Sequence, residues 1–353
     1  MSRRMLCQLR LSALALAVLI AGAVPAHAQG CVAAHSNQQS MDSLCGPGFD
    51  STGHGWMHRL TLNIGYRVFS SNKYFIGTNQ IDRSSAVENH QNIWDVGVNY
   101  QATPRWSVIA DVPIFDGSRD QIYPPKGIFR VAGIGDITVG AQTWVFRPPT
   151  ESNGNVAFNF SLKLPTGLND ATGTALLNGQ IVQATADQSL QPGDGTWGFV
   201  LGTQAFRQVW WQTMLYLQGS WLFSPEDTTG VATFRHQPGQ GVMSATDQYL
   251  FRAGVSHGVP KIRRLSLSFG ARWEGVPAHD VFGESDGFRR PGYIVSIDPG
   301  LMYDYRHEMI SVNAPWAIRR NREPSVPEIE NNTPNGDAFF ADYTIIVGYS
   351  HHF

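Results

Sequence analysis

The feature of this sequence that most restricts its fold is an alternation of apolar and polar residues, which recurs along the chain from residue 57 onward. In the stretch 59–68, the even-numbered positions, such as Leu60 and Ile64, are apolar, whereas the odd-numbered positions include Arg59 and Arg67. These two sets of alternate positions are called the apolar parity and the polar parity. Successive side chains of a β-strand point to opposite faces. The alternation therefore predicts strands with one apolar face and one polar face.

Twelve segments show this pattern. They are residues 59–68, 94–100, 106–114, 137–145, 156–164, 197–206, 211–223, 249–257, 265–274, 293–304, 309–316 and 341–353. An even number of antiparallel strands can close into a barrel, which removes the exposed sheet edge and satisfies every backbone group in lipid. A soluble β-sandwich would also alternate, so two further observations are needed to separate the alternatives.

The first observation is where charge is absent. The apolar parity of the twelve segments contains no Asp, Glu, Lys or Arg. A Lys or Arg that faces lipid at mid-bilayer costs about 2–4 kcal/mol, whereas a lumenal position tolerates it. The charges of the other parity are nearly balanced, which predicts ion pairs that either shape a constriction or fill the barrel. The predicted channel-lining residues are Arg59, Arg67, Asp95, Asp111, Asp136, Lys163, Arg252, Arg272, Glu274 and Asp298.

The second observation is the rhythm of the connections, which alternate between short and long. The long ones are residues 70–90, 116–135, 166–196, 224–246, 275–291 and 317–340. Outer-membrane barrels have short periplasmic turns, long external loops and girdles of interfacial aromatic residues. Aromatic residues do occur near the ends of the apolar parity, Trp106, Trp211 and Trp273 among them. The sequence thus predicts an all-β, closed, antiparallel 12-stranded transmembrane β-barrel over residues 57–353.

Composition agrees with this fold and excludes other classes. Charged residues make up 15% of the chain, below the roughly 25% of soluble domains. An aromatic content of 11% and a net charge of −2 argue against a disordered chain. Near-zero net charge also offers no basic face, so no nucleic-acid partner is expected.

The N-terminal residues have the features of an export signal. Three arginines precede a short apolar run, which is followed by Pro25-Ala26-His27-Ala28, the pattern of a secretory signal peptide. We expect residues 1–28 to be removed and residues 29–56, which show no strand pattern, to form a periplasmic tail or a plug in the lumen. A lipoprotein signal ending at Cys31 is a weaker alternative.

Two cysteines follow the signal, Cys31 and Cys45. In an oxidising compartment such a pair predicts one disulfide, which would remove roughly 3 kcal/mol of unfolded-chain entropy. Free thiols remain an alternative. Together with His35 the pair falls short of a closed zinc site, so neither a metal nor a cofactor is expected.

Two further sets of residues have predicted roles. Asp136 and Lys163 lie on consecutive strands and are expected to pair in the lumen, either as part of a constriction or to fix register. The chain ends in an alternating segment with Tyr349 and a terminal Phe353, which looks like the signal by which the barrel-assembly machinery of Gram-negative-type bacteria recognises outer-membrane proteins.

Three glycine-rich motifs carry a resemblance to a known family. They are Gly-Ile-Gly-Asp-Ile-Thr-Val-Gly at 133–140, Leu-Lys-Leu-Pro-Thr-Gly at 162–167 and Pro-Gly-Asp-Gly-Thr-Trp at 192–197. With the region 57–353 around them, they resemble the family described as "MetA-pathway of phenol degradation". The resemblance implies an outer-membrane transporter of aromatic or other hydrophobic small molecules, without catalytic residues.

The sequence therefore predicts an outer-membrane channel whose partners are membrane lipid and small-molecule solutes, with selectivity set by lumenal side chains and the loops 166–196 and 317–340. One alternative is an adhesin or structural barrel that acts through its external loops. A second is a lipid hydrolase, for which Ser256-His257 and Ser350-His351-His352 are the candidates. Neither candidate has an acidic partner at a readable spacing, as a nucleophile–base pair usually does.

Overall fold

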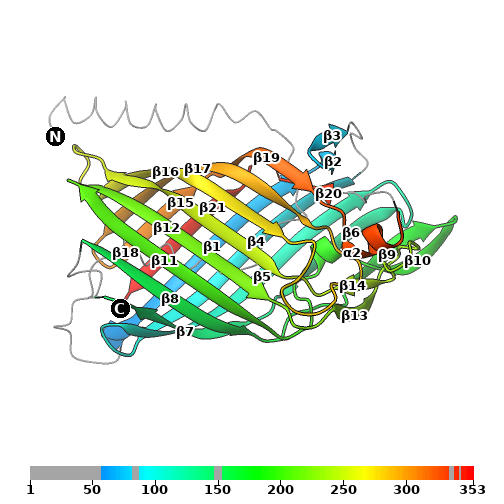
Figure 1. The fold of residues 1–353 in the computed structure, drawn as a ribbon, viewed down its shortest axis with the longest axis horizontal. Helices are drawn as coiled ribbons and strands as arrows, with labels where there is room; N and C mark the ends of the chain where they lie inside the picture. The colour runs from blue at the N-terminus through cyan, green and yellow to red at the C-terminus, as the bar shows by residue number, and fades with distance from the viewer. Residues whose placement is uncertain (1–56, 82–86, 147–152, 334–337, 342) are drawn as a thin grey trace.

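The structure is a computed structural model and describes residues 57–353, except 82–86, 147–152, 334–337 and 342. The predictions for residues 1–28, for residues 29–56 and for the Cys31–Cys45 disulfide lie outside the described residues. Within the described part, one large sheet curls into a barrel, with short turns at one end and longer excursions at the other (Figure 1). These ends are called the short-turn end and the long-loop end below.

The barrel wall contains fourteen β-segments, all of them paired antiparallel. In chain order they are β1 (Leu60–Ser71), β4 (Val87–Gln101), β5 (Trp106–Gln121), β6 (Gly127–Ile134), β7 (Thr138–Trp144), β8 (Gly154–Lys163), β11 (Gly198–Trp210), β12 (Thr213–Phe223), β15 (Gln248–Gly258), β16 (Leu265–Val276), β17 (Gly292–Tyr305), β18 (Glu308–Asn313), β19 (Trp316–Arg322) and β21 (Ile345–His352). Both β6 and β7 pair with β5, and both β18 and β19 pair with β17. Each of these couples is one interrupted strand, so the barrel has the twelve strands that the alternation predicts.

Local sequence explains the interruptions. The strand made of β6 and β7 breaks at Gly135-Asp136-Ile137, and the strand made of β18 and β19 breaks at Ala314-Pro315. Proline has no N–H to donate to a ladder. The predicted loop 116–135 is wrong in part, because it contains the end of β5 and all of β6. Alternation weakens there because the wall extends toward the long-loop end, where the outward face no longer has to be apolar.

Small elements gather at the long-loop end, as the right side of Figure 1 shows. They are β2 (Tyr74–Ile76), β3 (Asn79–Ile81), β9 (Thr172–Leu177), β10 (Gln180–Thr185), the 3-10 turn η4 (Gln188–Leu190), β13 (Thr228–Ala232), β14 (Val242–Ser244), α2 (Val326–Glu330) and β20 (Ala338–Phe339). None of the described helices is long and apolar enough to cross a membrane.

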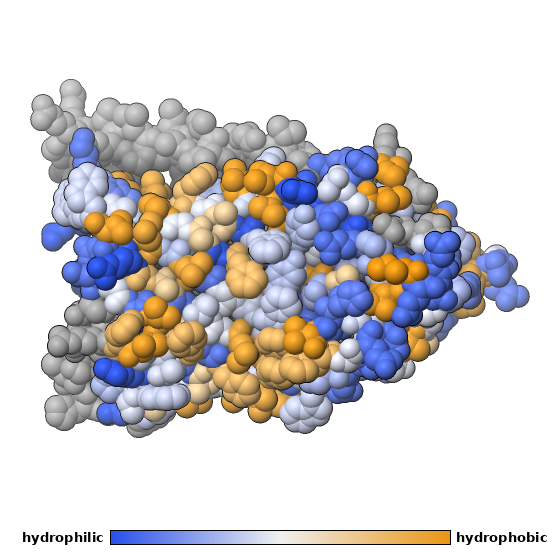
Figure 2. Space-filling model, viewed as in Figure 1, coloured by the Kyte–Doolittle hydropathy of each residue, from blue (hydrophilic) through white to orange (hydrophobic). Residues whose placement is uncertain are grey.

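The two faces of the wall differ as predicted. Large apolar side chains such as Val98, Phe160 and Leu217 are exposed on the outside, and apolar patches cover much of the barrel surface in Figure 2, with hydrophilic residues concentrated at the long-loop end. Outward-facing rings contact one another near that end, with Phe199 stacked on Phe223 at 4.8 Å between centroids. At the short-turn end Trp211 is exposed. This is the arrangement of a barrel surrounded by hydrocarbon, with an aromatic girdle at each interface.

Candidate functional site

The candidate site is the lumen, and the structure places the predicted channel-lining charges as follows. Nine of the ten are buried on the inner parity: Arg67, Asp95, Asp111, Asp136, Lys163, Arg252, Arg272, Glu274 and Asp298. Arg59 is the exception, because it lies in the exposed 3-10 turn η2 (Met57–Arg59) ahead of β1. Its guanidinium donates to the carbonyl oxygen of Ala102 in a neighbouring turn, 3.2 Å away. The strand thus begins one residue later than the alternation suggests, and the role of Arg59 in lining the channel stays a prediction.

The lumenal charges pair with near neighbours on the wall. Arg252 on β15 contacts Asp298 on β17 at 2.6 Å, and Asn313 also donates to Asp298. Arg272 donates through two nitrogens to Glu274, two residues further along β16. Paired charges of opposite sign project little net field, so this part of the lumen is polar without favouring one sign of ion.

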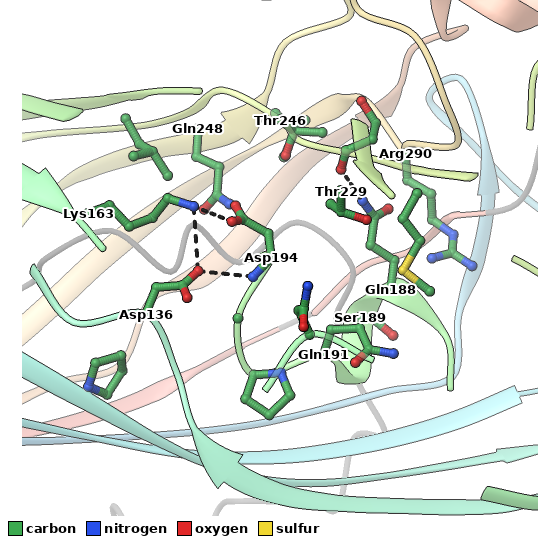
Figure 3. A pocket seen from close by; sticks show the side chains of 18 of the residues that line it. Asp136, Lys163, Gln188, Ser189, Gln191, Asp194, Thr229, Thr246, Gln248 and Arg290 are labelled. Atoms are coloured by element: carbon green, nitrogen blue, oxygen red, sulfur yellow. Dashed lines mark hydrogen bonds and ion pairs between the residues drawn. The ribbon is translucent and has the colours of Figure 1, made fainter. Parts of the chain in front are cut away.

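The predicted Asp136–Lys163 pair is present and belongs to a larger junction. The ammonium nitrogen of Lys163 lies 3.4 Å from a carboxylate oxygen of Asp136 and also binds Asp194 (Figure 3). Asp136 in turn accepts backbone N–H bonds from Gly167 and Asp194, both at 2.9 Å. The three motifs that carry the family resemblance thus meet at one point, at the break between β6 and β7.

Glycine is required at this junction for close approach. A Cβ on Gly135 would lie 2.7 Å from the carbonyl oxygen of Pro192, and a Cβ on Gly167 would lie 2.8 Å from the Cα of Gly193. Three backbone segments therefore touch where no side chain would fit. Their contact holds the segment 164–197, which leads from β8 to β11, against the barrel wall.

The segment 164–197 occupies the long-loop mouth of the barrel. Leu190 and Ala186 pack in a buried apolar cluster with Phe69, Ile93 and Phe115, which are inward-facing residues of β1, β4 and β5. The side-chain amide of Gln91 on β4 donates to the carbonyl oxygen of Ser189 at 2.8 Å. We call residues 186–194 the mouth segment.

A buried ionic cluster fixes the mouth segment. Asp187 receives two hydrogen bonds from Arg290, at 2.7 and 2.8 Å, and lies 3.7 Å from Arg119. All three side chains are almost completely inaccessible to solvent. Burial alone would raise the pKa of Asp187, but the guanidinium groups of Arg119 and Arg290 outweigh it and hold that pKa well below its usual value.

This shift predicts the pH at which the mouth segment loosens. A carboxylate whose pKa is depressed by folding stabilises the folded arrangement above its unfolded pKa of about 3.9, and the stabilisation is lost as the pH falls through the folded pKa. We expect hydrogen-exchange protection factors of the Ala186 and Leu190 amides, corrected for intrinsic rates, to stay constant from pH 7 to pH 5. They should fall only below about pH 4. In Asp187→Asn this acid step should be missing; an equal step in that variant would contradict the assignment.

A cavity of about 130 Å³ lies beneath the mouth segment. Its lining combines Gln191 and Asp194 of that segment with residues of the wall, among them Lys163, Val200 and Gln248 (Figure 3). Its lining includes both polar and apolar side chains. The cavity can therefore hold a small molecule next to the junction of the three motifs.

The lumen below this cavity has two unlike walls. Across β7, β8, β11 and β12, all described along their length, Lys163 is the single charged side chain on the inner parity, and it lies at the cavity. This uncharged wall ends toward the short-turn end in a cluster of Trp144, Ala157, Phe206 and Tyr216. The rest of the wall carries Arg67, Asp95, Asp111 and the ion pairs of β15 to β17. The uncharged wall thus runs from the cavity toward the short-turn end.

The candidates for catalysis do not assemble a nucleophile–base pair. His351 does have an acidic partner, Glu308 at 2.7 Å, which the register of β18 with β21 provides. Ser350, however, has the opposite parity and its hydroxyl donates to Asn63. The ring of His257 bonds to Thr213 at 2.8 Å. Among the described residues no group of three His, Cys, Asp or Glu side chains is placed to hold a metal ion.

Sequence reasoning missed the anchor of the mouth segment and the uncharged wall. Asp187 lies in a loop without periodicity, and its partners Arg119 and Arg290 are far away in sequence. The uncharged wall could have been recognised, since the four consecutive predicted strands between residues 136 and 223 have no charged residue on their polar parity except Asp136 and Lys163.

The fold resembles solved outer-membrane barrels. The COG4313 outer membrane channel from Pseudomonas putida F1 aligns with a TM-score of 0.55 at 12% identity, over 83% of this chain and 95% of that chain. The β domain of the Bordetella autotransporter BrkA aligns less closely, with a TM-score of 0.46 at 14% identity over 83% and 100% of the two chains. The toluene transporter TodX of P. putida gives 0.42 at 11% identity over 83% and 90%.

No protein-family model matches this chain, and a search of curated proteins finds no match. The resemblance to the phenol-degradation family therefore stays a prediction. At 12% identity the likeness to the P. putida channel concerns the fold alone. This chain is a closed, antiparallel, 12-stranded β-barrel of the outer-membrane type.

Proposed function

We propose that this protein is a channel for the passive uptake of small, uncharged hydrophobic or aromatic solutes across the outer membrane, without catalysis and without a cofactor. The observation that carries the proposal is the uncharged lumenal wall, which leads from the cavity beneath the mouth segment to the cluster of Trp144, Phe206 and Tyr216. Apolar and aromatic surface favours the transfer of such solutes out of water.

The two walls have complementary roles in this proposal. The ion pairs of the charged wall, Arg252 with Asp298 and Arg272 with Glu274, leave no strong field of one sign that would select ions. The mouth segment limits the size of solutes that enter. The predicted loop 317–340 is in part the wall strand β19, so only its remainder, together with the predicted loop 166–196, is proposed to set selectivity at the long-loop end.

The proposed location is the outer membrane of a Gram-negative-type bacterium, with lipid around the barrel and the barrel-assembly machinery as a partner during biogenesis. Tyr349 and Phe353, the proposed assembly signal, are at the short-turn end. The Tyr349 hydroxyl donates to Glu308, and the Phe353 ring lies edge-on to His351 at 4.6 Å between centroids. Short turns are periplasmic in such barrels, so this end faces the periplasm.

Uptake by intact cells tests the proposal. Toluene and other small aromatic solutes should enter a porin-deficient Gram-negative host several-fold faster when the protein is present in its outer membrane, because lipopolysaccharide slows their diffusion. A sugar such as arabinose should gain little. Equal uptake of aromatic solutes with and without the protein, at verified levels of folded barrel, would refute the channel.

A further inference from the structure

Two glutamine side chains in the middle of the uncharged wall have no hydrogen-bond partner within the described part of the chain. Gln204 on β11 and Gln218 on β12 are directly opposite each other in the ladder. Each is only 2% exposed, and both the oxygen and the nitrogen of each amide lack a partner among the described residues. A buried amide without a partner costs free energy, and most buried polar groups in proteins avoid this state. The two amides therefore have hydrogen-bonding capacity that the described residues leave unused.

Neighbouring polar atoms share this unmet capacity. The hydroxyls of Ser161 and Ser220 and the amide oxygen of Asn159 are also buried without a partner in the described part of the chain. Register places Ser220 and Asn159 beside Gly202, one inward-facing position from Gln204. A Cβ at Gly202 would lie 2.1 Å from the Asn159 amide oxygen, so glycine makes room for this side chain. Donors and acceptors are thus concentrated at one depth of the lumen.

An aromatic surface begins at the next inward-facing position. Phe206 follows Gln204 on β11 and Tyr216 precedes Gln218 on β12, a spacing of about 6.5–7 Å along each strand. Phe206 and Trp144 pack edge to face, with their centroids 6.0 Å apart. This spacing matches the length of a monosubstituted benzene. A ring that lies against Phe206 and Tyr216 would therefore place its substituent at the two amides.

Charge decides which substituents suit the site. The cations nearest in the ladder and at the cavity are already neutralised, Arg252 by Asp298 and Lys163 by Asp136 and Asp194. An anionic group at Gln204 and Gln218 would lose its hydration without gaining a counter-ion. A neutral group that both donates and accepts hydrogen bonds would satisfy the amides at no such cost.

We propose that Gln204 and Gln218 form a recognition site for neutral aromatic solutes that carry a hydrogen-bonding head group, such as a carboxamide or a hydroxyl. The proposal rests on the channel function and specifies its solute class. The head group bonds to the two amides while the ring lies against Phe206 and Tyr216. Bare hydrocarbons pass the same point without satisfying the amides, and aromatic carboxylates are disfavoured.

Calorimetry tests the site without requiring transport. It measures the binding of benzamide to the purified barrel in detergent, with empty micelles as the reference. The variant Gln204→Met/Gln218→Met keeps side-chain length and removes both amides, and replacing unpartnered polar groups with apolar ones of similar shape does not threaten folding. We expect benzamide and phenol to bind the variant about tenfold more weakly, since roughly two hydrogen bonds are lost. Binding of benzoate to the wild type should be weaker than that of benzamide.

Gln101→Met is the matched control, because Gln101 has the inner parity of β4, which lies four strands away from β11 in the sheet. It should leave benzamide affinity unchanged. Equal affinity of the wild type and the double variant for benzamide would overturn the site and indicate that water alone satisfies the amides.

Toluene uptake by cells is measured in parallel. Failure of that uptake with intact benzamide binding would reject the channel, whereas normal uptake without amide-dependent binding would reject only this site.

Discussion

Asp187→Asn should raise the ionic conductance of the barrel in planar bilayers and shorten its closed periods. In the wild type, one carboxylate neutralises Arg290 and Arg119 at a fully buried position. Removing one partner of a buried ionic cluster costs about 3–5 kcal/mol, because the remaining charges stay buried without compensation. Since about 1.4 kcal/mol corresponds to a factor of ten, the ratio of docked to released mouth segments should fall by roughly 100-fold or more.

Asp170→Asn is the matched control, because Asp170 lies in the same connection between β8 and β11 but is exposed. It removes the same charge and should leave conductance and closed times unchanged. Equal increases in the two variants would mean that loop charge, and not the buried anchor, controls the mouth. Unchanged conductance in Asp187→Asn would show that the apolar packing of Leu190 is sufficient to hold the segment.

A second large effect is expected on the outside of the barrel. Leu217 lies near the middle of β12, faces outward and is 49% exposed. Leu217→Arg would place a guanidinium in hydrocarbon, and we expect the free energy of unfolding to fall by about 2–4 kcal/mol. Guanidinium titrations of the barrel in phospholipid vesicles would measure this difference.

Ile181→Arg provides the comparison. Ile181 lies on the β9–β10 hairpin at the long-loop end and is 79% exposed, in water if the barrel spans the membrane as proposed. The same new charge should therefore change the free energy of unfolding by less than about 0.5 kcal/mol. Similar losses in both variants would mean that the surface around Leu217 is not surrounded by lipid.

The wall of this barrel could be predicted from the sequence because a membrane constrains every strand in the same way. Each outward position must be apolar, so the alternation repeats twelve times. A strand whose own pattern is weak can therefore be assigned from the pattern of the other strands. Asp136 and Lys163 could be paired because they lie at facing ends of consecutive strands. The fold and one ionic contact thus follow from local periodicity and strand order.

The contents of the lumen could not be predicted in the same way. The mouth segment has no periodic pattern of apolar and polar residues, and the ion pair that anchors it joins Asp187 to Arg290, 103 residues later. The acidic partner of His351, Glu308, becomes visible only when β18 and β21 are placed in register. Gln204 and Gln218 have the composition of any polar parity, and their unmet hydrogen bonds appear only once the neighbours around them are known.

The seam where β1 meets β21 has a consequence for biogenesis. The contact between Thr61 and His352 joins residues 291 positions apart. Nascent chains therefore carry two unprotected sheet borders until synthesis is nearly complete, and such borders recruit other strands. Contacts this distant also form slowly. Unassisted refolding should accordingly be slow and prone to aggregation at high protein concentration.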